Sequence, residues 1–513
     1  MRCGRIMRRL GLLLFVAATC LLWAFLAHAE EQETRSFGLV VGTNISNDPD
    51  VKPLRYADDD AVNNAKLMGE LGAQVVLLVG LDYESKKMFP EIQETPPTRN
   101  AIEQAMARLN QMMEKARSQG QRPIFYFFYS GHGDVDNNRG YVNLKDGRFW
   151  REDLMALLAQ SAANENHVVI DACKSYFLVF DRGKGGERAP LSGSLIGDKS
   201  SLPTNTGVVL STSSAADSHE WEAFQAGVFS HEVRSALRGA ADQNLDGQVT
   251  YEEAAAFVWG ANVSVPNPKF RPNVFVHAPG EKRADEAVLA DMRATRVDNL
   301  VVGPGVTEHL YIEDQAGRRL ADLRPAPEQT VSLLLPKERP LFVRQSGSDE
   351  EVELPQGNRL VLAALPKRVT TVARRGAEHV AFRSLFSRPF GQQTVIDYRN
   401  CPPEAVEIIE THRDLTWLRR GTGILGLGAA LLGGTMTGLS ARESSSVKPR
   451  TAGTKRKEVN DRIDRYNIVA VTSYALAGVG LATYLVWTLW PEKPVEIQVM
   501  PNRETQVRIS VGF

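Results

Sequence analysis

Apolar runs that alternate with helical patterns constrain the fold of this chain most strongly. The runs FGLVVGT, AQVVLLVG, PIFYFFYS and HVVIDAC are separated by RYADDDAVNNAKLMGEL, PTRNAIEQAMARLNQMMEKARSQG and REDLMALLAQS, and a further run, TGVVLSTS, follows. Continuous apolar strands that alternate with helices are typical of parallel sheets buried on both faces. Residues 30–280 are therefore predicted to form an α/β domain with a mostly parallel sheet flanked by helices.

A histidine and a cysteine each follow one of these predicted strands. His132 lies in the turn YSGHGD, and Cys173 lies in HVVIDACKSY, 41 residues further on. Because ligand sites of such sheets lie beyond the carboxyl ends of the strands, we expect both side chains at one edge. A thiol is a good nucleophile only as the thiolate, and a nearby imidazole can accept its proton. The pair predicts an active site, with a buried structural histidine as the alternative for His132.

YSGHGD followed by IDACKS resembles the caspase-like cysteine peptidases, and within them the bacterial metacaspase-like branch. LRYADDDA and AGVFSHEV resemble the same branch, so the resemblance extends over roughly residues 35–260. It implies a caspase-like fold, a peptide or protein substrate and endopeptidase activity. It also implies that Cys173 attacks the scissile carbonyl, that His132 is the general acid/base, and that the backbone N–H groups of Gly133 and Cys173 form the oxyanion hole.

The resemblance further implies cleavage after arginine or lysine, because members of this branch bind the basic side chain with acidic residues. Asp171 matches one such position and Asp217 matches another loosely, with a helix cap or a solvent-exposed position as the alternative for Asp217. A buried carboxylate can pair with a guanidinium through two hydrogen bonds. Residues 174–206 are rich in Gly, Ser and Pro and contain basic residues, which predicts a long loop that the enzyme itself cuts.

The segment DQNLDGQVTYEE, residues 242–253, matches the twelve-residue calcium-binding loop position by position. Its glycine stands at the sixth position, where the loop turns sharply. The predicted calcium ligands are Asp242, Asn244, Asp246, the carbonyl of Gln248 and Glu253. Such loops normally occur in pairs and only this one is found, so a helix–loop–helix without metal is the alternative.

The N-terminus and the cysteines indicate the compartment. Residues 1–29 carry a basic start, an apolar stretch and AHA, which predicts a signal peptide, with an uncleaved anchor as the alternative. Beyond this segment only Cys173 and Cys401 remain. Exported domains that depend on disulfides carry more cysteines, so we expect a reduced thiol at Cys173. A Cys173–Cys401 disulfide is the alternative.

The rest of the chain changes pattern twice. Residues 281–297 look like a helical linker, and residues 298–400 hold short strands between Pro and Gly turns, which predicts a small β-sandwich that acts as a spacer or a protein-binding module. Residues 416–490 contain two uncharged stretches, each long enough to cross a bilayer, with a stripe of small residues for close packing. A buried soluble hairpin is the alternative.

The loop between these stretches, residues 442–466, carries eight basic residues, which places it in the cytoplasm. The tail, residues 491–513, alternates like a strand and is expected on the opposite side, with the β-sandwich as its candidate partner. The formal net charge of −1 argues against a general nucleic-acid binder. The sequence predicts an exported cysteine endopeptidase tethered to the inner membrane of the cell envelope, with its peptidase domain outside the cytoplasm. The alternatives are a catalytically silent scaffold or a calcium-responsive adaptor.

Overall fold

The structure is a computed structural model of the chain. The predicted signal peptide, Asp217, Cys401 and the segment 174–201 lie outside the residues that it describes. The chain divides into two compact units, Met1–Ala405 and Val406–Phe513. The described residues are 32–49, 51–136, 139–173, 202–211, 220–266, 271–293, 295, 298–369, 384–400, 408–410, 416–446, 453–489, 496–500 and 506–510.

The first unit is built on a six-stranded sheet with the order β12-β8-β7-β3-β1-β2. All neighbouring pairs are parallel except β12 with β8, which confirms the predicted mostly parallel sheet. Strand β12 was not predicted. The strands are β1 (Thr34–Thr43), β2 (Gln74–Val79), β3 (Arg122–Gly131), β7 (Glu165–Asp171), β8 (Thr206–Ser211) and β12 (Val274–His277).

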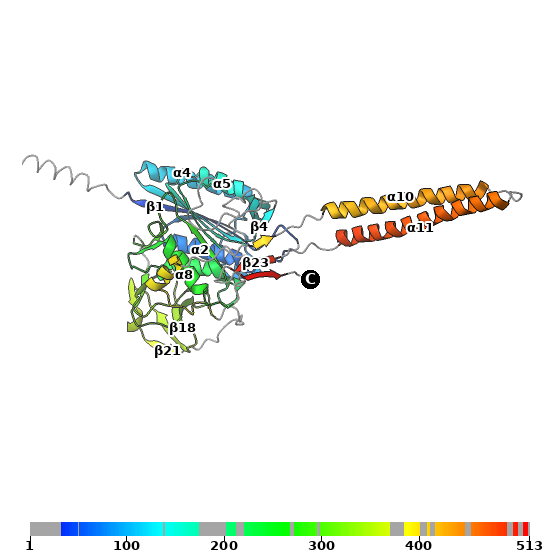
Figure 1. The fold of residues 1–513 in the computed structure, drawn as a ribbon. Helices are drawn as coiled ribbons and strands as arrows, with labels where there is room; N and C mark the ends of the chain where they lie inside the picture. Colours follow the sequence, from blue (N-terminus) through cyan, green and yellow to red (C-terminus); the bar gives the residue numbers. More distant parts are fainter. Residues whose placement is uncertain are drawn as a thin grey trace, which may run out of the picture. The chain divides into compact units, whose positions relative to one another are not determined.

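Helices cover both faces of this sheet, with α4 and α5 on one face and α2 and α8 on the other (Figure 1). Along β3, Phe125 and Phe127 belong to the buried cluster that includes α4, whereas Tyr126 and Phe128 belong to the cluster that includes α2 and α8. Successive side chains of a strand point to opposite faces, so β3 contributes to both cores. The helices are α2 (Ala57–Glu70), α3 (Tyr83–Met88), α4 (Arg99–Ser118), α5 (Arg151–Ala159) and α8 (Tyr251–Asn262).

Short elements surround the carboxyl ends of these strands. Directly after β3, three strands form an antiparallel sheet, namely β4 (Gly133–Asp136), β5 (Arg139–Leu144) and β6 (Gly147–Trp150). After β8, the hairpin of β9 (Glu220–Trp221) and β10 (Ala226–Gly227) leads into helix α7 (Val228–Ser235). A wider helical turn, η1 (Ala236–Ala240), continues α7 as far as the predicted calcium loop.

The predicted helical linker over residues 281–297 is wrong at its centre, where the structure has strand β13 (Val288–Asp291). This strand pairs in antiparallel fashion with β11 (Gln248–Thr250), inside the predicted calcium loop. The pairing satisfies backbone N–H and C=O groups on both strands, which a helix at residues 288–291 would leave unpaired on β11.

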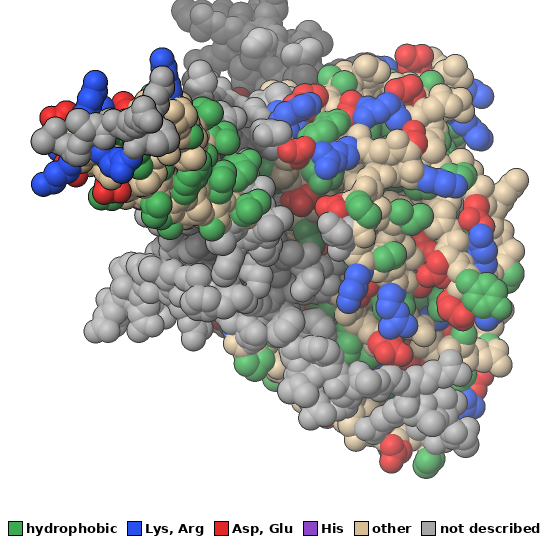
Figure 2. Space-filling view, turned by 90° about the vertical axis from the view of Figure 1, so that its right-hand side faces the viewer, with side chains coloured by type: hydrophobic (Ala, Val, Ile, Leu, Met, Phe, Trp, Pro, Cys, Tyr) green, Lys and Arg blue, Asp and Glu red, His purple; other side chains and the backbone are tan. Residues whose placement is uncertain are grey.

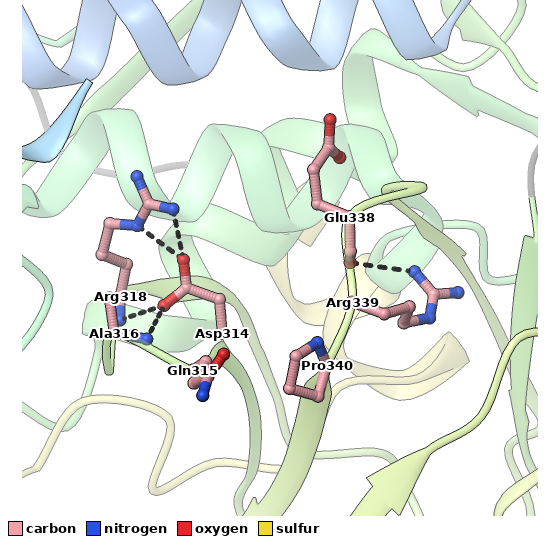
Figure 3. Close-up of a pocket in the computed structure, with 7 residues that line it drawn as sticks. All are labelled: Asp314, Gln315, Ala316, Arg318, Glu338, Arg339 and Pro340. Atoms are coloured by element: carbon pink, nitrogen blue, oxygen red, sulfur yellow. Dashed lines mark hydrogen bonds and ion pairs between the residues drawn. The ribbon is translucent and has the colours of Figure 1, made fainter. Parts of the chain in front are cut away.

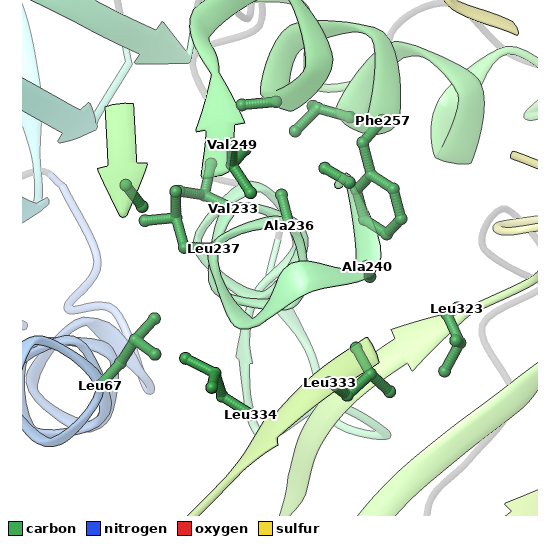
Figure 4. Close-up of a cluster of buried hydrophobic side chains, with 14 of the residues drawn as sticks. Leu67, Val233, Ala236, Leu237, Ala240, Val249, Phe257, Leu323, Leu333 and Leu334 are labelled. Atoms are coloured by element: carbon green, nitrogen blue, oxygen red, sulfur yellow. The ribbon is translucent and has the colours of Figure 1, made fainter. Parts of the chain in front are cut away.

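The strand-rich region consists of two sheets with the orders β17-β14-β20 and β16-β15-β18-β19-β21. Leu333 from one sheet and Leu323 from the other belong to the same buried cluster as Val233 of α7 and Phe257 of α8 (Figure 4). One continuous core therefore joins this region to the α/β domain. Its strands are β14 (Asp298–Val302), β15 (Leu310–Asp314), β16 (Arg319–Leu323), β17 (Val331–Leu335), β18 (Leu341–Gln345), β19 (Glu350–Leu354), β20 (Arg359–Val361) and β21 (Lys367–Val369).

Residues 298–400 are not strands throughout. Helix α9 (Gln392–Asn400) ends this region and packs on α8. The Arg399 guanidinium donates two hydrogen bonds, of 2.8 and 2.6 Å, to the Glu252 carboxylate on α8. The end of the region is therefore attached to the α/β domain by packing and by a bidentate ion pair.

The second unit contains two long apolar helices, α10 (Thr416–Ser446) and α11 (Gly453–Leu489). They approach closely at Gly426, because a Cβ on Gly480 would lie 2.9 Å from the Gly426 Cα. The predicted stripe of small residues consists of Gly426, Ala430, Gly434 and Gly438. An added Cβ on Gly438 would have no atom within 4 Å, so the stripe packs only in part. Hydrophobic side chains line the hairpin, and charged ones gather at its tip (Figure 2).

The C-terminal tail pairs differently from our expectation. Strand β23 (Glu496–Met500) pairs with β24 (Gln506–Ser510) and with β22 (Ile408–Glu410), all in antiparallel fashion. Its partner is therefore the segment just before α10 and not the predicted β-sandwich. This pairing brings together the two chain segments that flank the helical hairpin.

Candidate active site

The two predicted catalytic residues leave the sheet side by side. Strands β3 and β7 are parallel neighbours, and their last paired residues are Ser130 and Asp171. His132 and Cys173 each lie two residues beyond this pair. The parallel register therefore places the histidine turn and the cysteine at the same edge of the sheet, as the sequence predicted.

The backbone at Gly133 lies against Cys173. A Cβ on Gly133 would lie 2.7 Å from the Cys173 carbonyl oxygen and 3.0 Å from the Ala172 Cβ. Real Cβ atoms do not come this close to backbone oxygens, so this approach requires glycine. Cys173 is a thiol and is 7% exposed. The structure thus brings together the two residues whose N–H groups were predicted to form the oxyanion hole.

The His132 turn is held by a buried tyrosine. The Tyr129 hydroxyl lies 3.0 Å from the His132 carbonyl oxygen and 2.8 Å from the Asn143 carbonyl oxygen, and it can donate its one proton to either. The Asn143 N–H donates to the His132 carbonyl (3.0 Å). Burial lowers the pKa of the His132 imidazole, against a backbone hydrogen bond with Lys52 that raises this pKa. Among the described residues, His132 Nε2 has no hydrogen-bond partner. The imidazole is therefore neutral near pH 7 and has a ring nitrogen available to exchange a proton.

Asp171 lies in an acidic group at the same edge. Its Oδ2 accepts hydrogen bonds from the Ser230 N–H (3.1 Å) and the Ser230 hydroxyl (2.6 Å) on α7. Asp60 on α2 accepts a hydrogen bond from the Gly227 N–H (2.8 Å) and pairs with Arg234 (2.8 Å). A Cβ on Gly227 would lie 2.7 Å from Asp171 Oδ2 and 3.0 Å from Asp60 Oδ2. Glycine at residue 227 therefore allows the backbone to pack closely against both carboxylates.

A third carboxylate joins this group from the β9–β10 hairpin. Glu220 pairs with Gly227 across the hairpin, and its carboxylate accepts hydrogen bonds from the N–H groups of Arg55 (3.0 Å) and Tyr56 (2.8 Å). Sequence reasoning identified Asp171 but missed Glu220 and Asp60. LRYADDDA was a signal for Asp60, whereas nothing local distinguished Glu220 from its neighbours.

Burial raises the pKa of each carboxyl group in the acidic group. Burial raises the pKa of Asp171, and burial together with the charge of Asp171 raises the pKa of Glu220. Burial raises the pKa of Asp60 to about 7, although the Arg234 guanidinium opposes that rise. A cationic group that entered this site would stabilise the ionised carboxylates. Asp171 and Glu220 are half-buried and Asp60 is buried, so the first two are the ones that a ligand can reach.

In the predicted calcium loop, backbone N–H groups donate hydrogen bonds to the side chains of the predicted ligands. Asp242 Oδ2 accepts a hydrogen bond from the Gly247 N–H (3.0 Å), Asn244 Oδ1 from the Asp246 N–H (3.1 Å), and Glu253 Oε2 from the Thr250 N–H (2.9 Å). These bonds turn the side-chain oxygens toward the inside of the loop. Both carboxylate oxygens of Asp246 and the second oxygen of Glu253 also accept hydrogen bonds within the loop. Among the carboxylate oxygens of the predicted ligands, this leaves Asp242 Oδ1.

Asp242 has a buried carboxylate oxygen that could bind a cation. Its side chain is 3% exposed, and its Oδ1 has no hydrogen-bond partner among the described residues. Burial and the charges of Asp246 and Glu253 raise the pKa of Asp242 to about 6. Within the described residues, no three His, Cys, Asp or Glu side chains are arranged to hold a metal by themselves. A calcium loop also uses amide and carbonyl oxygens, so the donor set present here fits calcium.

A cavity of about 390 Å³ in the strand-rich region lies apart from these groups (Figure 3). Three of its charged side chains are already in ion pairs, Arg318 with Asp314 and Arg339 with Asp298, and Glu338 also lines it. None of the lining residues is a nucleophile. The strand ends, and not this cavity, are therefore the candidate active site.

Comparison with known proteins agrees with this geometry. Residues 35–258 match the family model of the caspase domain. This part of the chain is a caspase-like domain. Its match includes the His132 turn, Cys173, the acidic group and the calcium loop, but not the strand-rich region. No curated protein matches the chain.

Solved caspase structures resemble the chain only distantly. Caspase-1 from Spodoptera frugiperda is 14% identical, with a TM-score of 0.31, over 51% of this chain and 92% of that one. The initiator caspase Dronc from Drosophila is 11% identical, with a TM-score of 0.23, over 40% and 69%. These values are too low to support an argument, so the assignment depends on the family model and on the sheet.

The contact at Gly133 gives a stability prediction. We expect Gly133→Ala to lower the free energy of unfolding by about 1–3 kcal/mol, because the added methyl would overlap the Cys173 carbonyl. Urea unfolding measures this change. Gly80→Ala is the matched control, since its Cβ would lie 4.0 Å from the nearest atom, on Pro97. Equal stability of the two variants would contradict the packing described here.

Proposed function

We propose that the chain is a cysteine endopeptidase that cleaves proteins or peptides after arginine or lysine. The observation that supports this most directly is the register of β3 and β7, which delivers His132 and Cys173 to one edge of the sheet. The family match supports a cysteine-type peptidase. The main alternative, a catalytically silent scaffold, is favoured only by the burial of Cys173.

The proposed reaction uses groups that already lie at this edge. His132 takes the thiol proton of Cys173, and the sulfur attacks the scissile carbonyl carbon. The oxyanion that forms accepts hydrogen bonds from the N–H groups of Gly133 and Cys173. His132 then gives its proton to the leaving amine as the C–N bond breaks, and water hydrolyses the thioester. The low pKa of His132 suits the first step, because a neutral imidazole can accept the proton.

Hydrolysis of a fluorogenic arginyl peptide tests the reaction directly. We expect turnover by the full-length chain and none by the Cys173→Ala variant. Absence of turnover in the unaltered chain, together with no labelling of Cys173 by an arginyl affinity probe, would favour the scaffold.

The proposed specificity depends on the acidic group. Asp171 and Glu220 approach the same glycine from two different elements, and each is half-buried. Burial raises the pKa of both carboxyl groups, which means that their ionised forms are disfavoured. A guanidinium or ammonium group would stabilise the ionised forms by its positive charge, and this attraction would favour its binding. Asp60 is buried and already paired with Arg234.

Calcium is proposed to bind the loop 242–253. Asp242, Asp246 and Glu253 would supply carboxylate oxygens, Asn244 its amide oxygen, and Gln248 its carbonyl. Strand β11 of this loop pairs with β13, which takes the place that a second calcium loop normally occupies. Bound calcium would supply positive charge that holds these ligands in their ionised form.

A membrane tether and export complete the proposal. Segments within α10 and α11, Gly421–Ser446 and Lys455–Leu485, are long and apolar enough to cross a bilayer. Large apolar side chains on the hairpin are exposed, including Leu425 at 73% and Leu431 at 74%. We propose that the hairpin crosses the inner membrane with its basic loop in the cytoplasm, and that the caspase-like domain lies on the other side.

The protonation state of His132 predicts how turnover depends on pH. Because burial lowers this pKa, the imidazole stays neutral until the pH falls below about 6.5, the ordinary value for histidine. We expect the acid limb of kcat below that pH. Measurement at saturating substrate removes the effect of protonation on binding to the acidic group. An acid limb centred above about pH 7 would contradict the buried imidazole.

The acidic group predicts the effect of one isosteric change. We expect Glu220→Gln to lower kcat/KM for an arginyl peptide about tenfold, since one charge-assisted contact is lost. The amide oxygen can still accept the hydrogen bonds from Arg55 and Tyr56, so the hairpin is kept. The control is Glu222→Gln, two residues away on an exposed side chain. A similar loss in both variants would remove Glu220 from the pocket.

The calcium loop predicts a binding defect that does not depend on activity. We expect Glu253→Gln to weaken calcium binding at least about tenfold, because a bidentate ligand loses its charge. Glutamine can keep the capping box with Thr250 at the start of α8, so the helix should remain. Isothermal titration with calcium measures the effect, and Glu286→Gln, on an exposed side chain, is the control. Undetectable heat with the unaltered chain would reject the site.

A further inference from the structure

Helix α7 connects the acidic group, which is the proposed substrate pocket, to the strand-rich region. Ser230 and Arg234, one turn apart, bind Asp171 and Asp60. His231 and Ser235, the next positions on the helix, contact Asp322 of β16 instead. Successive residues of a helix are about 100° apart around its axis, so α7 presents adjacent faces to the pocket and to β16.

Asp322 holds α7 at two points. Its Oδ2 lies 2.8 Å from His231 Nε2, and its backbone N–H donates a 3.0 Å hydrogen bond to the Ser235 hydroxyl. The Ser235 hydroxyl in turn donates to the His231 carbonyl at 2.9 Å. The side chains of Asp322 and His231 are fully buried. These contacts fix both the position and the rotation of α7 about its axis.

The Asp322 carboxylate is surrounded by cationic and imidazole groups. Its Oδ1 lies 2.7 Å from His309 Nε2 and 2.9 Å from Arg319 Nη1, both in the strand-rich region. Arg319 and the two histidines hold the pKa of Asp322 well below its usual range, although burial opposes them. A buried carboxylate with this many partners stays ionised and keeps a single geometry.

The same group also supports the β9–β10 hairpin. Phe224, in the turn between β9 and β10, stacks on His231 with ring centroids 4.1 Å apart. The Arg319 guanidinium lies 5.5 Å from the centre of the Phe224 ring. Glu220 begins this hairpin and Gly227 ends it. Helix α7, which binds Asp171 and Asp60, and the hairpin, which carries Glu220, are therefore both anchored at Asp322 and its partners.

We infer that Asp322 is a positioning residue for the substrate pocket, and that the strand-rich region is thereby a fixed part of the substrate-binding unit and not a spacer. This inference rests on the proposed function, because it concerns the same pocket. Asp322 touches neither Asp171 nor Glu220, so it acts through α7 and the hairpin.

Two variants of the full-length chain test the inference. Asp322→Asn keeps the shape of the side chain but removes the charge that His231, His309 and Arg319 share. Ser235→Ala is milder, since it removes one hydroxyl from the contact between α7 and β16. The control is Asp298→Asn, in the same region, where the carboxylate binds Arg339 and the Gly357 N–H instead.

Kinetics with an arginyl peptide provide the first measurement. We expect KM to rise about tenfold to a hundredfold in Asp322→Asn, and in the same direction in Ser235→Ala, because a displaced pocket loses its contacts. We expect a smaller change in kcat, since His132 and Cys173 lie on other elements. If Asp322→Asn does not fold, Ser235→Ala carries the test. Unchanged KM in every folded variant, or an equal rise in Asp298→Asn, would overturn the inference.

Hydrogen exchange separates this inference from the proposed function. If the unaltered chain shows no turnover, the proposed function fails, and amide exchange of Val228–Ala240 still decides the positioning role. Faster exchange there in Asp322→Asn and Ser235→Ala than in Asp298→Asn supports the inference. Equal exchange in all of them overturns it.

Discussion

The parallel pairing of β3 with β7 is the interaction on which the candidate site depends. It aligns Ser130 with Asp171, and this alignment sets where the following residues leave the sheet. A shift of one residue would turn every side chain of a strand to the opposite face. Such a shift would turn Phe127 and Val168, which are buried in the core that includes α4, toward the opposite core, and would offset His132 from Cys173. Hydrophobic burial and site geometry therefore select the same register.

Helix α7 has the same importance for the pocket that β3 and β7 have for the catalytic pair. All of its residues are buried, and it contacts the central sheet, α2, α8 and β16. Its polar residues are distributed among these neighbours, so the helix forms hydrogen bonds or ion pairs on several sides. A helix held on every side has little freedom to move. The proposed substrate pocket, which contains Asp171 and Glu220, would accordingly be formed before any substrate binds, and this would reduce the entropy lost on binding.

The strand-rich region has a different meaning in the structure than in the sequence. Its short strands and turns suggested a separate module, and the family model also ends before it. Yet Leu323 and Leu333 pack in the same core as Val233 and Phe257 (Figure 4). Strand β16, which carries Asp322, was not predicted, because GRRLADL mixes charged and apolar residues without strict alternation. Asp322 of this strand is buried because His231, His309 and Arg319 pair with it. A search for alternating hydrophobic residues does not detect a buried charged side chain of this kind.

The sequence by itself determined the features that depend on local patterns. It located five strands of the central sheet, the turn at His132, the strand end at Cys173, the calcium-loop motif and the two apolar helices. Only the tertiary structure decided which strands are neighbours, that Asp60 and Glu220 join Asp171, and that Asp322 holds α7. The physical reason is that strand and helix periodicity is set by adjacent residues, whereas these contacts join side chains far apart in the chain, and only packing of the whole core brings them together.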